Sequence, residues 1–192
     1  MAYEAPVAVY DACVLFPFHL RNLLVQCAVD GLVEARWTNT IHDEWTRTLA
    51  ARNPSLPIER LRTTRELMNA VLPEALVTNH EPLIADLVLP DLDDRHVLAA
   101  AIAAKASVIV SWNLADFPAH ALAPYGVACK TPDAFLVELY GASPDALAAV
   151  VDRARLNLRA TKPAREDFLE ALARQGLTEL IGVLRDHQDE ES

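Results

Sequence analysis

Four acidic residues are the part of this sequence best suited to chemistry. They are Asp11, Glu44, Asp94 and Asp116, and each follows a strand-like run or lies on a helix next to one. Clusters of carboxylate oxygens bind hard divalent cations such as Mg²⁺, which can activate water. If the fold gathers these acids, they predict a hydrolytic metal site.

The placement of two of these acids follows from the expected strands. Asp11 comes directly after the apolar run PVAVY, and Asp116 lies a few residues beyond the run SVIVS. In open parallel sheets, ligands bind outside the carboxyl ends of the strands. Both carboxylates are therefore expected at that edge of the sheet.

The other two acids are expected on helices that lean toward the same edge. Asp94 falls in the first turn of an alanine-rich helix, where the helix dipole favours the ionised carboxylate. Glu44 lies three residues after Ile41, on a helix whose apolar face includes Ile41 and Trp45. This spacing lets Glu44 point toward the cluster.

Each acid also has an ordinary structural explanation. Asp11 and Asp116 could begin a turn or cap a short helix, and a single acid such as Glu44 is usually a surface residue. The acids of LPDLDD could be an N-cap with solvated neighbours. Within that segment the order of preference for the functional residue is Asp94, then Asp91, then Asp93. The functional interpretation rests on the combination of acids.

The elements that would position these residues alternate between strand and helix. Strand-like runs cover 6–10, 32–37, 107–111 and 126–130, with a shorter extended piece at 75–78. Amphipathic or alanine-rich segments separate them, which predicts right-handed crossovers and a parallel sheet covered on both faces. The fold class is therefore α/β.

Beyond Thr131 the strand signal disappears and four helical segments follow one another. Pro132, Pro144 and Pro163 fall near expected helix starts, and Gly141 and Gly176 near expected ends. The tail after residue 140 is therefore expected to be a helical extension.

Composition limits the class of protein. With 192 residues, 52% of them hydrophobic, the chain can form one domain with an appendage. No apolar run approaches the roughly 20 residues needed to span a bilayer, and the start lacks a signal-peptide pattern. A cytoplasmic protein without a membrane partner is expected. The isolated Cys13, Cys27 and Cys129 are expected to be core thiols, in neither a disulfide framework nor a zinc site.

The acid-bearing segments resemble those of a known family. Asp11 after its strand, IHDEW with Glu44, LPDLDDRHVLAAAI with Asp94, and VSWNLADF with Asn113 and Asp116 look like the PIN-domain ribonucleases. The resemblance is greatest to the VapC-type toxins of bacterial toxin–antitoxin pairs. It covers about residues 6–135, in the family's order.

The resemblance implies a fold, an activity and a set of site residues. The implied fold is a three-layer α/β/α sandwich with a parallel sheet of about five strands. By position, Asp11, Glu44, Asp94 and Asp116 would be catalytic ligands of Mg²⁺ or Mn²⁺, with Ser111 and Asn113 in support. The implied activity is hydrolysis of RNA, leaving a 5′-phosphate and a 3′-hydroxyl.

The resemblance also implies partners and a domain organisation. Residues 1–138 would form the nuclease domain, and residues 139–192 resemble the helical extension of some VapC-like proteins. That extension could pack on the nuclease, bind an antitoxin protein, or form a homodimer contact.

The net charge of −10 raises the question of where RNA would bind. Two groups of basic residues could track its backbone, could be ordinary solvated helix faces, or could contact an acidic stretch of the antitoxin. The first group is Arg47, Arg52, Arg60, Arg62 and Arg65, and the second is Arg153, Arg155, Arg159, Lys162 and Arg165. The six histidines are scattered without ligand spacing, so none is assigned to metal.

Two other functions compete with the ribonuclease. A Mg²⁺-dependent phosphatase with an aspartyl nucleophile would also place an acid after its first strand, but it usually needs a second acid two residues on, where this chain has Cys13. A signalling or scaffold domain similar to response-regulator receivers lacks the expected paired acids and leaves Glu44 unexplained. Both rank below the ribonuclease.

Overall fold

A parallel sheet of four strands lies at the centre of the computed structural model, which describes residues 3–191, with side chains through residue 187. The strands are β1 (Val7–Tyr10), β2 (Glu34–Arg36), β3 (Val108–Val110) and β4 (Ala128–Lys130), in the order β2-β1-β3-β4. All three pairings are parallel. The predicted α/β class with a parallel sheet is confirmed.

The sheet has four strands in the described part of the chain, whereas about five were expected. The extended piece at 75–78 forms only one bridge, between Leu76 and Trp37. Its backbone bonds are confined to that point: Trp37 donates to Ala75 at 2.9 Å, and Val77 donates to Trp37 at 2.8 Å. The preceding residues form a 3₁₀ turn, η1 (Pro73–Ala75), so too few residues are left to form a strand.

Helices connect the strands and continue after the last one. In the first part of the chain they are α1 (Ala12–Leu15), α2 (Phe18–Val29), α3 (Asn39–Arg52), α4 (Ile58–Val71), the 3₁₀ helix η2 (Glu81–Asp86), α5 (Arg95–Ala103), α6 (Ala119–Leu122) and the 3₁₀ helix η3 (Ala123–Tyr125). The C-terminal helices are α7 (Pro132–Ala142), α8 (Pro144–Leu156), α9 (Arg165–Arg174) and α10 (Thr178–Glu191).

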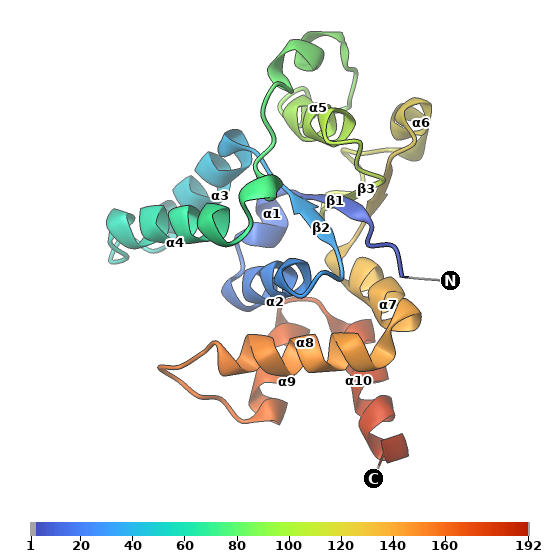
Figure 1. Ribbon diagram of the computed structural model, residues 1–192. Coiled ribbons are helices and arrows are strands. Elements are labelled where there is room, and N and C mark those ends of the chain that lie inside the picture. The colour runs from blue at the N-terminus through green and yellow to red at the C-terminus, as the bar shows by residue number, and fades with distance from the viewer. Residues whose placement is uncertain (1–2, 192) are drawn as a thin grey trace.

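The helices form layers on both faces of the sheet, as Figure 1 shows. Helix α5 covers one face, where it contacts β1 and β3, and α2 and α7 lie on the other. Helix α8 packs on α2 and α7, so the C-terminal helices add a further layer beyond α2. The predicted sandwich with C-terminal helices is therefore observed.

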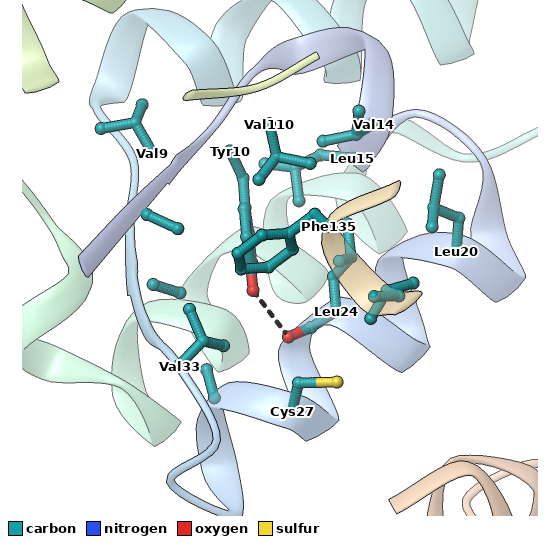
Figure 2. Close-up of a cluster of buried hydrophobic side chains, with 14 of the residues drawn as sticks. Val9, Tyr10, Val14, Leu15, Leu20, Leu24, Cys27, Val33, Val110 and Phe135 are labelled. Carbon is teal, nitrogen blue, oxygen red and sulfur yellow. Dashed lines mark hydrogen bonds between the residues drawn. The ribbon is translucent and has the colours of Figure 1, made fainter. Parts of the chain in front are cut away.

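Buried strands and helix faces form the core between these layers. Every residue of β3 is buried, as expected for a parallel strand covered on both faces. Figure 2 shows Tyr10 of β1 among apolar side chains that include Leu24 and Phe135. Its hydroxyl donates to the Leu24 carbonyl at 3.3 Å, which satisfies the one polar atom of a fully buried ring.

The order of the strands determines where a ligand can bind. The chain runs from β1 to β2 on one side, and then returns to β3 on the other side of β1. The carboxyl ends of β1 and β3 therefore form the topological switch point of the sheet. Asp11 and Ser111 are the residues that directly follow these two strands, and the Asp11 amide donates to Val110 at 3.1 Å.

No described helix is both long enough and apolar enough to cross a membrane.

Candidate active site

Asp11 is the most firmly held of the predicted site residues. It is 4% exposed, and it caps the first turn of α1, where the Ala12 amide donates to Oδ1 at 2.6 Å. The Ser111 hydroxyl donates to Oδ2 at 2.6 Å, and the Cys13 thiol donates to the same oxygen at 3.1 Å. These bonds fix the orientation of the carboxylate at the switch point.

Ser111 and Asn113, predicted as supporting residues, belong to the turn after β3. The Asn113 amide donates to the Ser111 hydroxyl oxygen at 3.0 Å, while that hydroxyl donates to Asp11. Ser111 is fully buried, and Asn113 is exposed at the cleft. These contacts are of the kind expected of supporting residues, and their part in catalysis stays a prediction.

Asp94 stands directly before α5 and faces other acids. Burial, and then the charges of Asp11, Asp116 and Asp91, raise the pKa of Asp94 to about 6, while His96 lowers it in part. The charges of the neighbouring carboxylates therefore disfavour the ionised form of Asp94, in addition to its burial.

The local alternatives to Asp94 lie differently. Asp91 and Asp93 are exposed, and neither lines the cleft that contains Asp94. The Asp91 carboxylate accepts a hydrogen bond from the Asp93 amide at 2.8 Å, which is a turn-forming contact. This geometry supports the order of preference that places Asp94 first.

Glu44 reaches the cleft from α3 and has a partner that the sequence did not predict. Its Oε1 lies 2.9 Å from Nε2 of His96, a buried residue of α5. This contact joins α3 and α5 at the site. His96 was passed over because no second histidine stands at ligand spacing from it; its position directly after the LPDLDDR acids was the available signal.

A cleft brings most of these residues together. Its volume is about 360 Å³, and three of the four predicted acids line it: Asp11, Glu44 and Asp94. The fourth, Asp116, is half-buried in the turn after Asn113 and does not line the cleft, but its charge reaches Asp94. The other lining residues are Ala12, Cys13, Phe16, Trp45, Thr48, Arg52 and Asn113.

Cys13 corrects the expectation that all three cysteines are core thiols. All three are free, but Cys13 lines the cleft and contacts both Asp11 and Ser111. Burial, and then the charge of Asp11, raise the pKa of Cys13 to about 12, so the thiol stays neutral and can donate to the carboxylate. Nothing in its apolar sequence context distinguished it from a core cysteine.

Arg52 is the only cationic side chain among the residues that line this cleft. Its guanidinium carbon lies 4.9 Å from the centroid of the Phe16 ring, a cation–π contact. Within residues 3–187, no carboxylate forms an ion pair with it. The Arg21 guanidinium donates to the carbonyls of Leu15 and Phe16 at 2.6 and 3.2 Å, which fixes the turn that carries the Phe16 ring.

The chemistry of these side chains fits a divalent cation. Burial is the largest cause of the raised pKa of Asp94, and the charges of Asp11, Asp116 and Asp91 add to it; a bound cation would offset these charges. No three His, Cys, Asp or Glu side chains of the described residues are grouped closely enough to hold one metal ion. Mg²⁺ is usually held by one or two carboxylates and keeps several waters, and Asp11 and Asp94, which line the same cleft, are the residues that would hold it. The role of Asp11, Glu44, Asp94 and Asp116 as a set of four ligands stays a prediction.

Comparison with known proteins identifies the family. The sequence model of the PIN domain matches residues 7–115, which is more than half of the chain. The chain belongs to the PIN-domain family. The resemblance seen in the acid-bearing segments is thereby confirmed. The PIN match contains Asp11, Glu44, Asp94 and Asn113, and it ends one residue before Asp116.

A second match concerns the C-terminal helices. The model named VapC50 C-terminal domain matches residues 132–186. A Mycobacterium tuberculosis (strain ATCC 25618 / H37Rv) protein named "Putative ribonuclease VapC50" is 47% identical over 58 residues. These residues are 30% of this chain and 34% of that protein, so the alignment spans about a third of the relative. No solved structure matches the chain.

Proposed function

We propose that this PIN-domain protein is a divalent-cation-dependent endoribonuclease that hydrolyses RNA phosphodiester bonds. The observation that carries the proposal is that Asp11 and Asp94 line one cleft at the switch point, where burial and the charges of neighbouring carboxylates raise the pKa of Asp94. The sequence similarity to a protein named "Putative ribonuclease VapC50" supports the same proposal.

Each residue of the site has a separate part in this proposal. A bound Mg²⁺ or Mn²⁺ would supply water activation and neutralise charge on the phosphate. Asp11 would hold the cation in one orientation, because Ser111 and the Ala12 amide fix its carboxylate. Asp94 would be its second anchor. Asp116 is proposed as a more distant charge.

Glu44 is the fourth residue of the proposed catalytic set, and His96 determines where its carboxylate lies. The 2.9 Å contact directs Oε1 toward α5 while the side chain still lines the cleft. This leaves the other carboxylate oxygen available to accept a hydrogen bond from a water molecule or a ribose hydroxyl.

RNA would approach along the Arg52 side of the cleft. The first basic group of the sequence is divided in the structure: Arg62 pairs with Glu59 and Arg65 pairs with Asp43. Arg52 is unpaired within the described side chains and faces the cleft, so it is the member best placed to contact a phosphate.

The test is cleavage of a labelled single-stranded RNA by the purified protein in Mg²⁺ or Mn²⁺, with EDTA as the metal-free control. We expect 5′-phosphate and 3′-hydroxyl products. Asp11→Asn and Asp94→Asn should abolish cleavage because each keeps its shape and loses its charge, whereas Asp93→Asn, outside the cleft, should cleave like the parent. Parent-like cleavage by Asp11→Asn in Mn²⁺ would contradict the assignment.

We further propose that the protein acts in the cytoplasm as the toxin of a toxin–antitoxin pair. Expression without a partner should arrest bacterial growth, and Asp11→Asn should relieve the arrest at equal protein level. A co-expressed antitoxin protein that covers the cleft should also relieve it. Normal growth at high expression of the parent would contradict the toxin role and leave the nuclease proposal standing.

The proposed parts are a nuclease domain, residues 1–138, and an extension, residues 139–192. Helix α7 (Pro132–Ala142) spans this boundary and joins the two parts without a linker. A homodimer is proposed as the alternative to a monomer, to be decided by light scattering of the purified protein.

A further inference from the structure

The extension touches the active-site region at one very close approach. Gly176 lies between α9 and α10 with a φ of +101°, in the region that favours glycine. A Cβ added there would lie 2.7 Å from Cη2 and 3.0 Å from Cζ2 of Trp112. The indole ring therefore occupies the space above the glycine.

Trp112 stands between the two supporting residues of the site. The Ser111 hydroxyl on one side donates to Asp11 at 2.6 Å, and the Asn113 amide on the other donates to Ser111 at 3.0 Å. The Trp112 amide itself donates to Cys13 Sγ at 3.3 Å. A movement of Trp112 would thus also displace Ser111 and Cys13, the side chains that donate hydrogen bonds to Asp11.

The turn that carries Gly176 also holds a second segment near the site. The Gln175 side-chain oxygen accepts a hydrogen bond from the Leu20 amide at 2.8 Å, in the first turn of α2. The residue before that helix, Pro17, provides no side-chain cap. Next to this contact, His19 meets the ring of Phe168 edge-on at 5.7 Å. The extension therefore braces both α2 and the turn after β3.

We propose that the C-terminal extension is a positioning element of the active site. The Trp112 ring packs directly on Gly176, which has no side chain. This contact fixes Trp112, and Trp112 in turn holds Ser111 and Asn113 in the arrangement that orients Asp11. The kinetic consequence rests on the proposed ribonuclease function; the effect on the turn after β3 does not.

The first test compares two glycines of the full-length protein. Gly176→Ala introduces the clash with Trp112, whereas Gly182→Ala in α10 meets no atom within 4 Å and is the matched control. We expect Gly176→Ala to lower kcat for RNA cleavage about 10- to 100-fold, as for a small misplacement of a reacting group, with KM unchanged. Gly182→Ala should keep the parent's kcat and KM.

The positive φ of Gly176 strains any other residue, so a second variant separates strain from contact. Phe is shorter than Trp and leaves room for a Cβ, and the backbone strain is the same in both backgrounds. We expect Gly176→Ala to lower both kcat and the midpoint of thermal unfolding more with Trp112 than with Trp112→Phe, where only the backbone strain remains. Equal loss in both backgrounds, including failure of both to fold, would overturn the proposal.

Two further readouts do not require cleavage. Mn²⁺ titration should show weaker binding for Gly176→Ala than for Gly182→Ala, and the Trp112 emission, taken as the difference from Trp112→Phe, should shift. If the parent cuts no RNA but these shifts occur, the ribonuclease proposal fails and the positioning role stands. If the parent cuts RNA and Gly176→Ala matches Gly182→Ala, only the positioning role fails.

Discussion

Asp94 titrates near physiological pH, and that predicts how cation binding depends on pH. Its pKa of about 6 means that the carboxylate is largely protonated at pH 5 and ionised at pH 7. A cation needs the ionised form, so Mn²⁺ affinity should fall as the pH decreases through 6. Isothermal titration between pH 5 and 8 measures this. The Asp94→Asn variant, which has no such titration, should bind weakly at every pH, and a flat profile for the parent would contradict the prediction.

Arg52 supports a prediction about RNA binding that is separate from catalysis. Arg52 lines the cleft and packs on the Phe16 ring. Arg52→Ala removes this cation, so RNA should bind more weakly, which raises KM and leaves kcat nearly unchanged. The slope of log affinity against log salt should fall by about 0.7, as for the loss of one phosphate contact to a single strand. Fluorescence anisotropy with the Asp11→Asn protein measures binding without cleavage.

The matched control for Arg52 is Arg47, which is exposed on the same helix and does not line the cleft. Arg47→Ala makes the same change in net charge. Equal effects of the two substitutions would show that RNA responds to overall charge and would contradict a specific contact at Arg52.

The residues of the site divide into those that sequence could predict and those it could not. Asp11 was accessible because a parallel sheet brings the residues after its strands to one edge. Ser111 was accessible only through its place in the motif that resembles the PIN-domain family. Cys13 and His96 were missed because their roles depend on contacts across the fold, with Ser111 and with Glu44, that local pattern does not contain. Three-dimensional packing alone creates these pairs.

At the scale of elements, a buried polar network joins α3 to α4 and to the end of β2. Trp45 Nε1 donates to His42 Nδ1 at 3.0 Å, so that atom is unprotonated and His42 Nε2 donates to Asn69 at 3.1 Å. Trp37 Nε1 donates to the same Asn69 oxygen at 2.8 Å. The network requires a neutral imidazole, and burial lowers the pKa of His42 to about 4.

This network predicts loss of stability in acid. Above pH 6.5 the His42 imidazole is neutral in both folded and unfolded chains, and its contribution to stability is complete. As the pH falls from about 6.5 to about 4, the unfolded chain binds a proton that the folded protein does not, which costs on the order of 3 kcal/mol. Below the folded pKa the loss stops growing. Urea unfolding at pH 7.5 and pH 5 measures the part of this loss reached by pH 5, about 2 kcal/mol.

The control for this prediction is His42→Gln, which cannot titrate. It should lower stability at pH 7.5 and weaken the pH dependence without removing it, because burial also lowers the pKa values of His19 and His80. An unchanged pH dependence in His42→Gln would contradict the role assigned to His42.

Element type was more predictable than strand count. Amino-acid composition alone predicts the element type of fully apolar runs such as Val108–Val110 and of the alanine-rich α5. The piece at 75–78 has strand-like composition too, yet pairs at a single point because the chain before it is a 3₁₀ turn. Whether a short extended piece joins a sheet depends on the connections beside it, which composition does not describe.

At the scale of the whole molecule, the extension and the sheet share one hydrophobic core. Buried side chains of the extension, such as Leu147 and Leu172, belong to the same continuous cluster as Val9 of β1. Gln175 and Asn22 add polar contacts across the boundary, Asn22 to the Ala154 carbonyl at 2.7 Å. We expect the two parts to unfold together, in one transition.

The distribution of tryptophans allows that expectation to be measured. All three, Trp37, Trp45 and Trp112, precede the extension, but Trp112 contacts Gly176 of the extension, so the Trp112→Phe protein is used, in which the fluorescence comes from Trp37 and Trp45. Helical circular dichroism includes the extension. Urea unfolding followed by fluorescence and by circular dichroism at 222 nm should therefore give coincident midpoints. Leu172→Ala opens a cavity in the extension and should lower the free energy of unfolding by about 2–5 kcal/mol. Both urea midpoints should therefore fall by the same amount. An ellipticity change that precedes the fluorescence change would show that the extension unfolds on its own, and would contradict the shared core.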